Sequence, residues 1–316
     1  MANAKEIQDR IKSIQDTMKI TKAMYMMSSM KLRQAKSKLE NTEPYFYSLQ
    51  EQISDILLHF PDMQHLFFEN RSKDLDKTVK RKAFIVITGD KGMAGAYNHN
   101  ILKEAQRMVD EAEDYHLYVV GELGRQYFMN QGYEIDKTFL FSANKPSIHR
   151  ARVITEYIVE LFKEEVFDEV YIIYTRMINS MTSTVEIEEL LPLKTHEYFK
   201  SELISKTQMG AGNYDNEAAK EADDWFLIYP SPQKVLEKLT YNYVTGFIYG
   251  ALVEGSASEE NARMLAMQSA TDNAQEMLRV LSIDYNRVRQ AAITQEITEV
   301  IGGAKALKKK KMKQTR

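Results

Sequence analysis

The chain has 316 residues, of which 44% are hydrophobic and 28% are charged, a composition typical of a globular protein with a sizeable core. It contains no cysteine, which excludes disulfides, thiol catalysis and thiolate metal sites. The formal net charge is -3, but residues 308–316 hold five lysines and one arginine, so basic charge is concentrated in the tail.

The first residues, MANAKEIQDR, lack the apolar core of a signal peptide and the arginine- and serine-rich composition of a transit peptide. No run approaches the roughly 18 apolar residues that span a bilayer. We therefore expect residence in a bacterial-type cytoplasm, with any membrane association made through other chains.

Residues 1–60 have the pattern of one long helix, with a single proline, Pro44, and no glycine. A seam with alternating spacings of three and four residues, the repeat of a coiled coil, runs through this segment. Its positions are Ile7, Ile11, Ile14, Met18, Thr21, Tyr25, Ser28, Leu32, Ala35, Leu39, Thr42, Phe46, Leu49, Ile53, Ile56 and Phe60. Thirteen of the sixteen are apolar, so we predict an N-terminal coiled-coil helix that bends at Pro44 and ends at Pro61.

Apolar residues also lie away from this seam between Met18 and Met30. They are Ile20, Ala23, Met24, Met26, Met27 and Met30. A helix that is apolar nearly all round is enclosed by something. Two interpretations stay open: other chains surround this segment, or it packs against the protein's own globular part.

Residues 61–230 are predicted to form an α/β globular domain. After a polar linker, 69–80, the pattern alternates between short apolar runs and amphipathic segments, which indicates a Rossmann-like domain with a mostly parallel sheet. Strands are predicted at 82–90, 115–121, 138–141, 169–176, within 179–193, and at 225–230. Helices are predicted at 98–113, with Ile101, Ala105, Met108 and Ala112 inward, at 122–132, and after Pro146, with Val153, Tyr157, Leu161 and Phe162 inward. A long polar loop, 205–224, precedes the last of these strands.

The C-terminal segment, 231–307, is predicted to be the second coiled-coil helix, capped by Ser231 with Pro232 at its first position. Its early part carries Gly246, Gly250 and Gly255, which allow close packing or bending. The seam continues through Met264, Met267, Thr271, Ala274, Leu278, Leu281, Tyr285, Val288 and Ala292. We expect an antiparallel coiled coil between the two terminal helices.

Beyond Ala292 the apolar positions move one residue along the chain. They become Ile293, Ile297, Val300 or Ile301, and Ala304. The N-terminal helix has no residues left to face them. We therefore expect the end of the long helix to leave its partner and to be enclosed by other subunits.

The loop TGDKGMAGAYN, 88–98, is the strongest candidate for ligand chemistry, because it joins a predicted strand to a predicted helix. Gly89, Gly92 and Gly95 are three residues apart, which matches neither the GxGxxG of dinucleotide sites nor the GxxxxGK of phosphate loops. We interpret it as a structural turn. The histidines are scattered and no serine lies in GxSxG, so the sequence nominates no catalytic, cofactor-binding or metal-binding residue.

Both terminal segments resemble the gamma subunit of F-type ATP synthases of the bacterial type. The stretch AKEIQDRIKSIQDTMKITKAMYMM is similar to that family's opening. The stretches ASEENARMLAMQSATDNA and YNRVRQAAITQEITEVIGGAKAL are very similar to its end. TGDKGMAGAYN is similar to the family's strand-to-helix loop, with Ala94 where a cysteine is common. The resemblance covers nearly the whole chain and is looser between Gln131 and Trp225.

The resemblance implies a non-catalytic rotor shaft inside a ring of alpha and beta subunits (3:3:1). It also implies that the α/β base meets the epsilon subunit and the membrane c-ring. The complex would lie at the cytoplasmic face of the cell membrane as a peripheral assembly, with no cofactor and no nucleic acid of its own. By resemblance, the residues that contact the beta subunits include Met24, Arg263, Gln290, Thr294 and Glu299. From the pattern alone, the four polar ones would be a solvated helix face or intrachain pairs.

Two other functions fit the residues without the resemblance. One is a soluble α/β nucleotide-binding enzyme with helical arms. The other is a coiled-coil scaffold or nucleic-acid binder that uses the basic tail, because clustered lysines attract polyanions. The tail also departs from the family pattern, in which chains commonly stop near the point that Leu307 reaches here, so we expect residues 308–316 to be dispensable.

Overall fold

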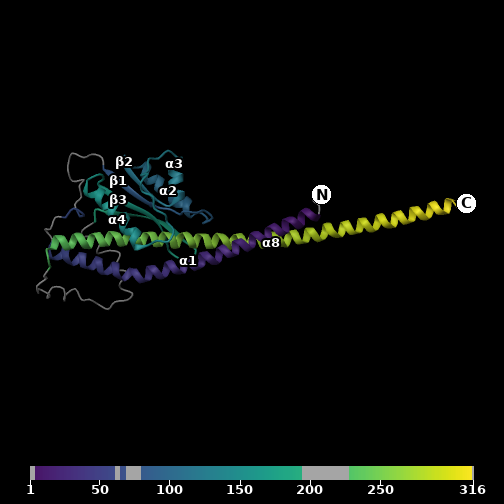
Figure 1. Ribbon diagram of the computed structural model, residues 1–316, viewed down its shortest axis with the longest axis horizontal. Helices are drawn as coiled ribbons and strands as arrows, with labels where there is room; N and C mark the ends of the chain where they lie inside the picture. The colour runs from purple at the N-terminus through teal and green to yellow at the C-terminus, as the bar shows by residue number, and fades with distance from the viewer. Residues whose placement is uncertain (1–3, 61–64, 69–79, 194–227, 315–316) are drawn as a thin grey trace. The chain divides into compact units, whose positions relative to one another are not determined.

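The computed structural model describes residues 4–60, 65–68, 80–193 and 228–314. It divides into two compact units. The sheet unit is Ser29–Ala262, and the coiled-coil unit combines Met1–Ser28 with Arg263–Arg316. Two long helices, α1 (Ala4–His59) and α8 (Pro232–Gln314), contribute segments to both units and are drawn in purple and in green to yellow (Figure 1).

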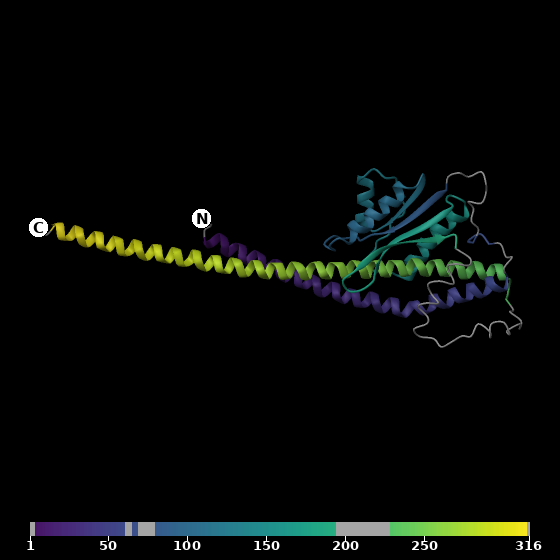
Figure 2. The same ribbon diagram turned by 180° about the vertical axis from the view of Figure 1, so that it is seen from behind.

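The coiled-coil unit pairs α1 with α8 in antiparallel fashion. Thr21 Oγ1 lies 2.8 Å from Thr271 Oγ1, and farther along the pair Ile11 and Leu278 line one shared groove. As numbers fall along α1 they rise along α8, which confirms the antiparallel coiled coil (Figures 1 and 2). Every predicted seam position from Ile7 to Phe60 is buried or half-buried, and α1 ends one residue before Phe60.

The seam of α8 ends earlier than predicted. Its positions from Met264 to Val288 are buried or half-buried, whereas Ala292 is exposed, so its assignment to the seam was wrong. Among the described residues, no turn of α1 lies opposite Ala292. All α8 residues from 289 to 305 are exposed.

The described residues of the sheet unit form a four-stranded sheet in the order β2-β1-β3-β4. They are β1 (Arg81–Ile87), β2 (Asp114–Val120), β3 (Glu169–Met177) and β4 (Ser183–Leu191). β1 pairs in parallel with β2 and β3, and β4 is antiparallel to β3, which confirms a mostly parallel sheet. The register places Phe84 opposite Leu117 and Tyr171, so the centre of β1 lies in the core.

Two predicted strands differ from the structure. The segment 138–141 forms only one isolated bridge, between Phe141 and Val120, because Asp136 holds the preceding turn through hydrogen bonds from the backbone amides of Thr138 and Phe139. In the predicted strand 225–230, residues 228–230 are not a strand, and residues 225–227 lie outside the described residues. The predicted 205–224 loop also lies outside them.

In the described part of the chain, helices α2 (Tyr97–Asp110), α3 (Glu122–Asn130) and α4 (Ile148–Lys163) pack beside the sheet, as does the first part of α8. α2 ends before Ala112, and it buries Leu102 and Val109 beside the predicted Ile101 and Ala105. Ser147 caps α4 by accepting a hydrogen bond from the amide of Arg150 at 3.3 Å. Its buried residues are Ala151, Ile154, Thr155, Ile158, Val159 and Phe162.

The predicted inward face of α4 was therefore partly right: Phe162 is fully buried and Tyr157 and Leu161 are half-buried, whereas the choice of Val153 was wrong. Val153 is 37% exposed, while Ile154 and Ile158 are fully buried. Two neighbouring stripes of this helix are apolar, so periodicity could not select between them. In the structure Tyr157 lies at the edge of the buried face of α4, where its hydroxyl donates to Asp136 at 2.6 Å.

Within the sheet unit, the first part of α8 packs against the second half of α1. Ser231 accepts from the amide of Lys234 at 3.4 Å, and α8 begins at Pro232, as predicted. Gly246 lies directly against Phe46 of α1, where a Cβ would be 1.4 Å from Cε1 of that ring. Close packing at this glycine is therefore confirmed.

Candidate functional site

The loop after β1 is tied into the protein's own structure. Asp90 accepts hydrogen bonds from Ser142 Oγ and from the amides of Asn144 at 2.9 Å, Ala143 at 3.3 Å and Glu122 at 3.2 Å. Burial alone would raise the pKa of Asp90, but these hydrogen bonds outweigh it and hold the pKa below its usual value. The carboxylate thus joins the loop after β1 to residues 142–144 and to the start of α3, in keeping with the structural turn predicted here.

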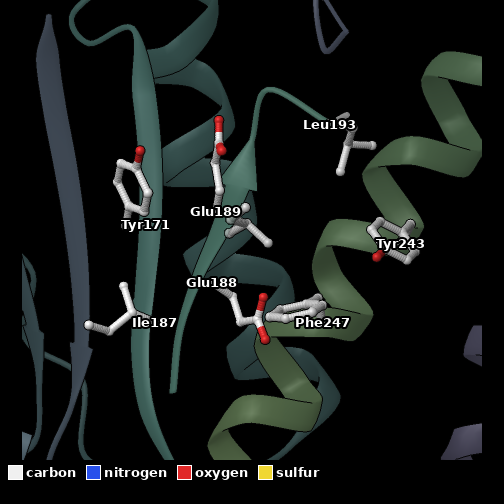
Figure 3. Close-up of a pocket in the computed structure, with 8 residues that line it drawn as sticks. Tyr171, Ile187, Glu188, Glu189, Leu193, Tyr243 and Phe247 are labelled. Atoms are coloured by element: carbon white, nitrogen blue, oxygen red, sulfur yellow. The ribbon is translucent and has the colours of Figure 1, made fainter. Parts of the chain in front are cut away.

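A cavity of about 300 Å³ lies beside β4, with Tyr171, Glu188 and Glu189 on the sheet and Tyr243 and Phe247 on α8 (Figure 3). The Glu188 side chain is directed toward Phe247. Burial and nearby Glu169 raise the pKa of Tyr171, so its phenol stays protonated at neutral pH. The lining offers two carboxylates and apolar rings but no nucleophile with a neighbouring base, and it does not have the make-up of a catalytic centre.

Metal and membrane signals are also missing from the described ranges. Within them, no group of three or more histidine, aspartate or glutamate side chains could hold a metal ion. Across the same residues, no helix combines the length and apolar character needed to cross a membrane.

The five predicted contact residues all lie in the coiled-coil unit, at positions of different exposure. Met24 is half-buried and Arg263 is 8% exposed. Gln290, Thr294 and Glu299 are exposed. The hydrogen bonds of these last three are local to the helix: Thr294 Oγ1 donates to the Gln290 carbonyl at 2.9 Å, and Gln295 Nε2 donates to Glu299 at 3.0 Å. Their side chains are therefore displayed outward on α8.

Large apolar side chains are displayed on the same unit. On α1, Ile20, Met26 and Met27 are 61%, 59% and 53% exposed. Met30, in the sheet unit, is 57% exposed. Pairing with α8 therefore leaves these side chains of α1 uncovered within their own units.

A second group lies at the end of α8, where the sequence predicted it. Ile293, Ile297, Val300 and Ile301 are between 46% and 71% exposed. Sequence reasoning missed a third group, Met277, Val280 and Ile283, which are 54%, 47% and 58% exposed beside the paired seam. Their spacing of three residues was the available signal. Exposed apolar surface of this extent marks an interaction site.

Comparison with known proteins gives one consistent family. The family model described as ATP synthase matches residues 3–307. The chain is 43% identical to an ATP synthase gamma chain of Acetivibrio thermocellus, over 98% of this chain and 100% of that one. It is 39% identical to a gamma chain of Acetobacterium woodii named sodium ion specific, over 96% and 99%. In fold it is similar to a chain of the Tetrahymena thermophila mitochondrial ATP synthase central stalk and c-ring structure, with a TM-score of 0.55 and 21% identity over 79% of this chain and 99% of that chain.

Proposed function

The chain belongs to the ATP synthase gamma chain family, and from this premise we propose how it works as the central rotor shaft of an F1Fo ATP synthase. It couples ion-driven rotation of the membrane c-ring to conformational change at the catalytic sites of the beta subunits. It performs no chemistry itself. The rival function as a nucleotide-binding enzyme would need a site that neither the loop after β1 nor the β4 cavity supplies.

The mechanism follows from symmetry. A single asymmetric rod inside a ring of alternating alpha and beta subunits presents a different face to each beta subunit. Each beta subunit is then biased toward a different conformation and nucleotide affinity. Because this is a coupling free energy, rotation and nucleotide binding influence each other reciprocally.

The observation that carries this function is the exposed end of α8. Residues 289–305 have no seam partner in the described chain, yet they display Ile293, Ile297 and Ile301. Burial of such side chains is favourable, at about 1.5–3 kcal/mol each, so a surrounding sleeve is the stable state. The alpha and beta subunits supply that sleeve.

Within it, Gln290, Thr294 and Glu299 are positioned to contact the beta subunits, because their side chains point outward among the apolar residues. Met24 and Arg263 complete the proposed contact set. Arg263 is mostly buried, so its contribution includes orienting the shaft surface as well as touching a partner.

The remaining assignments describe the base and its surroundings. Residues 1–60 and 231–307 form the shaft, and 61–230 form the base, which meets the epsilon subunit and the c-ring. The assembly lies at the cytoplasmic face of the cell membrane as a peripheral complex, and partner chains alone hold this chain there. No nucleic acid takes part.

The test compares two neighbouring residues on different faces of the tip. Ile297→Asp places a charge on the apolar face, while Thr298→Asp places the same charge on the polar face, where Thr298 Oγ1 bonds only to the Thr294 carbonyl. Each variant is assembled with alpha and beta subunits and purified. We expect Ile297→Asp to reduce recovery of the 3:3:1 complex and its ATP-driven ion pumping far more than Thr298→Asp. Equal behaviour of both variants, or recovery of the wild-type chain alone, would overturn the function.

A further inference from the structure

The carboxyl ends of β1 and β3 are the place where a sheet of this kind usually holds a ligand. The strand order reverses at β1, with β2 on one side and β3 on the other. In open α/β sheets the crevice beyond such a reversal is the common binding site. Here the α8 segment 254–262 lies against that edge.

Three side chains of α8 bond to the backbone of β3 and the turn after it. Glu254 accepts from the amide of Met177 at 3.1 Å. Ser258 donates to the carbonyl of Thr175 at 2.9 Å, and Asn261 donates to the carbonyl of Ser180 at 3.1 Å. Spacings of four and three residues place all three on one face of the helix.

The packing around these bonds leaves little room. A Cβ on Gly255 would lie 3.2 Å from Cγ2 of Ile87, and one on Gly89 would lie 2.9 Å from Oε1 of Glu259. On the side toward α1, Glu260 forms an ion pair with Lys31 at 2.9 Å. Helix α8 is thus fixed between the end of the sheet and α1.

Burial makes these bonds sensitive to rotation of the helix. Ser258 is 1% exposed and Asn261 is 3% exposed. Turning α8 about its own axis by one residue would separate the three pairs and leave buried polar groups without partners, which is more costly than an unmade bond at the surface.

We propose that Glu254, Ser258 and Asn261 form an angular lock, which fixes the rotational setting of α8 against the sheet and so transfers torque from the base to the shaft. They are positioning residues, and the lock rests on the proposed function as a rotor. The edge at which related sheets hold a ligand acts here as a mechanical joint.

The test uses the assembled complex with alpha and beta subunits. Because the chain has no cysteine, Lys137→Cys on the exposed surface of the base gives a single attachment point for a bead. The complex is fixed through its alpha and beta subunits and stalled without hydrolysis, and the spread of bead angles is recorded. We expect the variant Glu254→Ala/Ser258→Ala/Asn261→Ala to broaden this spread and to lower the ions pumped per ATP, with the hydrolysis rate retained.

Two variants control for general weakening. Glu254→Gln keeps an acceptor oxygen for Met177, so the spread should be narrower in Glu254→Gln/Ser258→Ala/Asn261→Ala than in the triple alanine variant. Thr245→Ala removes a buried hydroxyl whose bond, to the Tyr241 carbonyl at 2.9 Å, stays within α8, and it should change nothing. An unchanged spread in the triple variant, or the same broadening in Thr245→Ala, overturns the lock.

Hydrogen exchange tests the same bonds in a single variant, which is useful if the triple variant does not assemble into the complex. With Glu254→Ala alone, the Met177 amide should exchange about fivefold faster, as expected for the loss of one hydrogen bond. An unchanged exchange rate contradicts the lock. If the wild-type complex hydrolyses ATP with no bead rotation, the rotor function itself fails, which is a distinct result from rotation with an unaltered spread in the triple variant.

Discussion

Thr21 and Thr271 face each other across the antiparallel coiled coil, with their hydroxyl oxygens 2.8 Å apart. Each also lies within hydrogen-bond distance of a carbonyl of its own helix, the Met18 carbonyl at 3.1 Å for Thr21 and the Met267 carbonyl at 2.8 Å for Thr271. Because a hydroxyl has one proton, one threonine donates to the other, and the second donates to its own helix. The polar seam position Thr271 therefore faces the polar seam position Thr21, and a matched polar pair inside an apolar seam specifies register.

This pairing predicts strong non-additivity. Thr21→Val or Thr271→Val alone leaves one hydroxyl facing a methyl group and should cost about 1 kcal/mol of unfolding free energy. The double variant removes both hydroxyls and should be close to the wild type in stability. Thermal unfolding of the full chain, followed by helical circular dichroism, measures the cycle. Additive losses would show that the two hydroxyls do not interact.

Gly246 and Gly250 should respond in opposite ways to the same substitution. Gly246→Ala drives a methyl group into Phe46, and overpacking of this kind costs about 1–3 kcal/mol. A Cβ at Gly250 would meet no neighbour within 4 Å, so Gly250→Ala should stabilise the helix by up to about 1 kcal/mol. Denaturant unfolding of both variants decides the matter, and a shift of the same sign in both would refute the contact.

Asp90 should make the sheet unit sensitive to acid. The folded pKa of this carboxyl is lower than that of an unfolded aspartate, which is about 3.9, so its contribution is fully present above that pH and is lost as the pH falls through the folded value. Asp90→Asn should lower the melting temperature at pH 7, and the gap from the wild type should close below about pH 4. A gap that stays constant down to pH 3 would remove Asp90 from this role.

The sequence was sufficient to predict the coiled coil because a heptad seam needs a residue that can be buried at every third or fourth position. All seam positions from Ile7 to Phe60 are buried or half-buried in the structure. Where the pattern was ambiguous, it was only partly right: on α4 it predicted the burial of Phe162 but selected Val153, which is exposed, in place of Ile154. The segment 138–141 is apolar enough for a strand but is held as a turn by Asp136.

The candidate site was predictable only in part. Exposure of Ile293 and Ile297 followed from the end of the seam, whereas Gln290, Thr294 and Glu299 came from the family resemblance, because periodicity gives them only a solvated face. The bonds of Glu254, Ser258 and Asn261 could not be predicted. They join residues 77, 83 and 81 positions apart in the chain, and no local pattern signals such pairs.

The basic tail should be dispensable. Deleting residues 308–316 removes five lysines and one arginine but none of the proposed contact residues. We expect the truncated chain to assemble into a complex with unchanged ATP hydrolysis and ion pumping, measured in reconstituted vesicles. Loss of either activity would give the tail a role in coupling.

Rotation of the base driven by ATP tests the central claim most directly. A bead is attached through Lys137→Cys, the only cysteine of such a chain, in a complex that is fixed through its alpha and beta subunits. The rotor account predicts that ATP turns the bead in one direction, with pauses related by threefold symmetry. A complex that hydrolyses ATP while the bead shows only random fluctuation would contradict it.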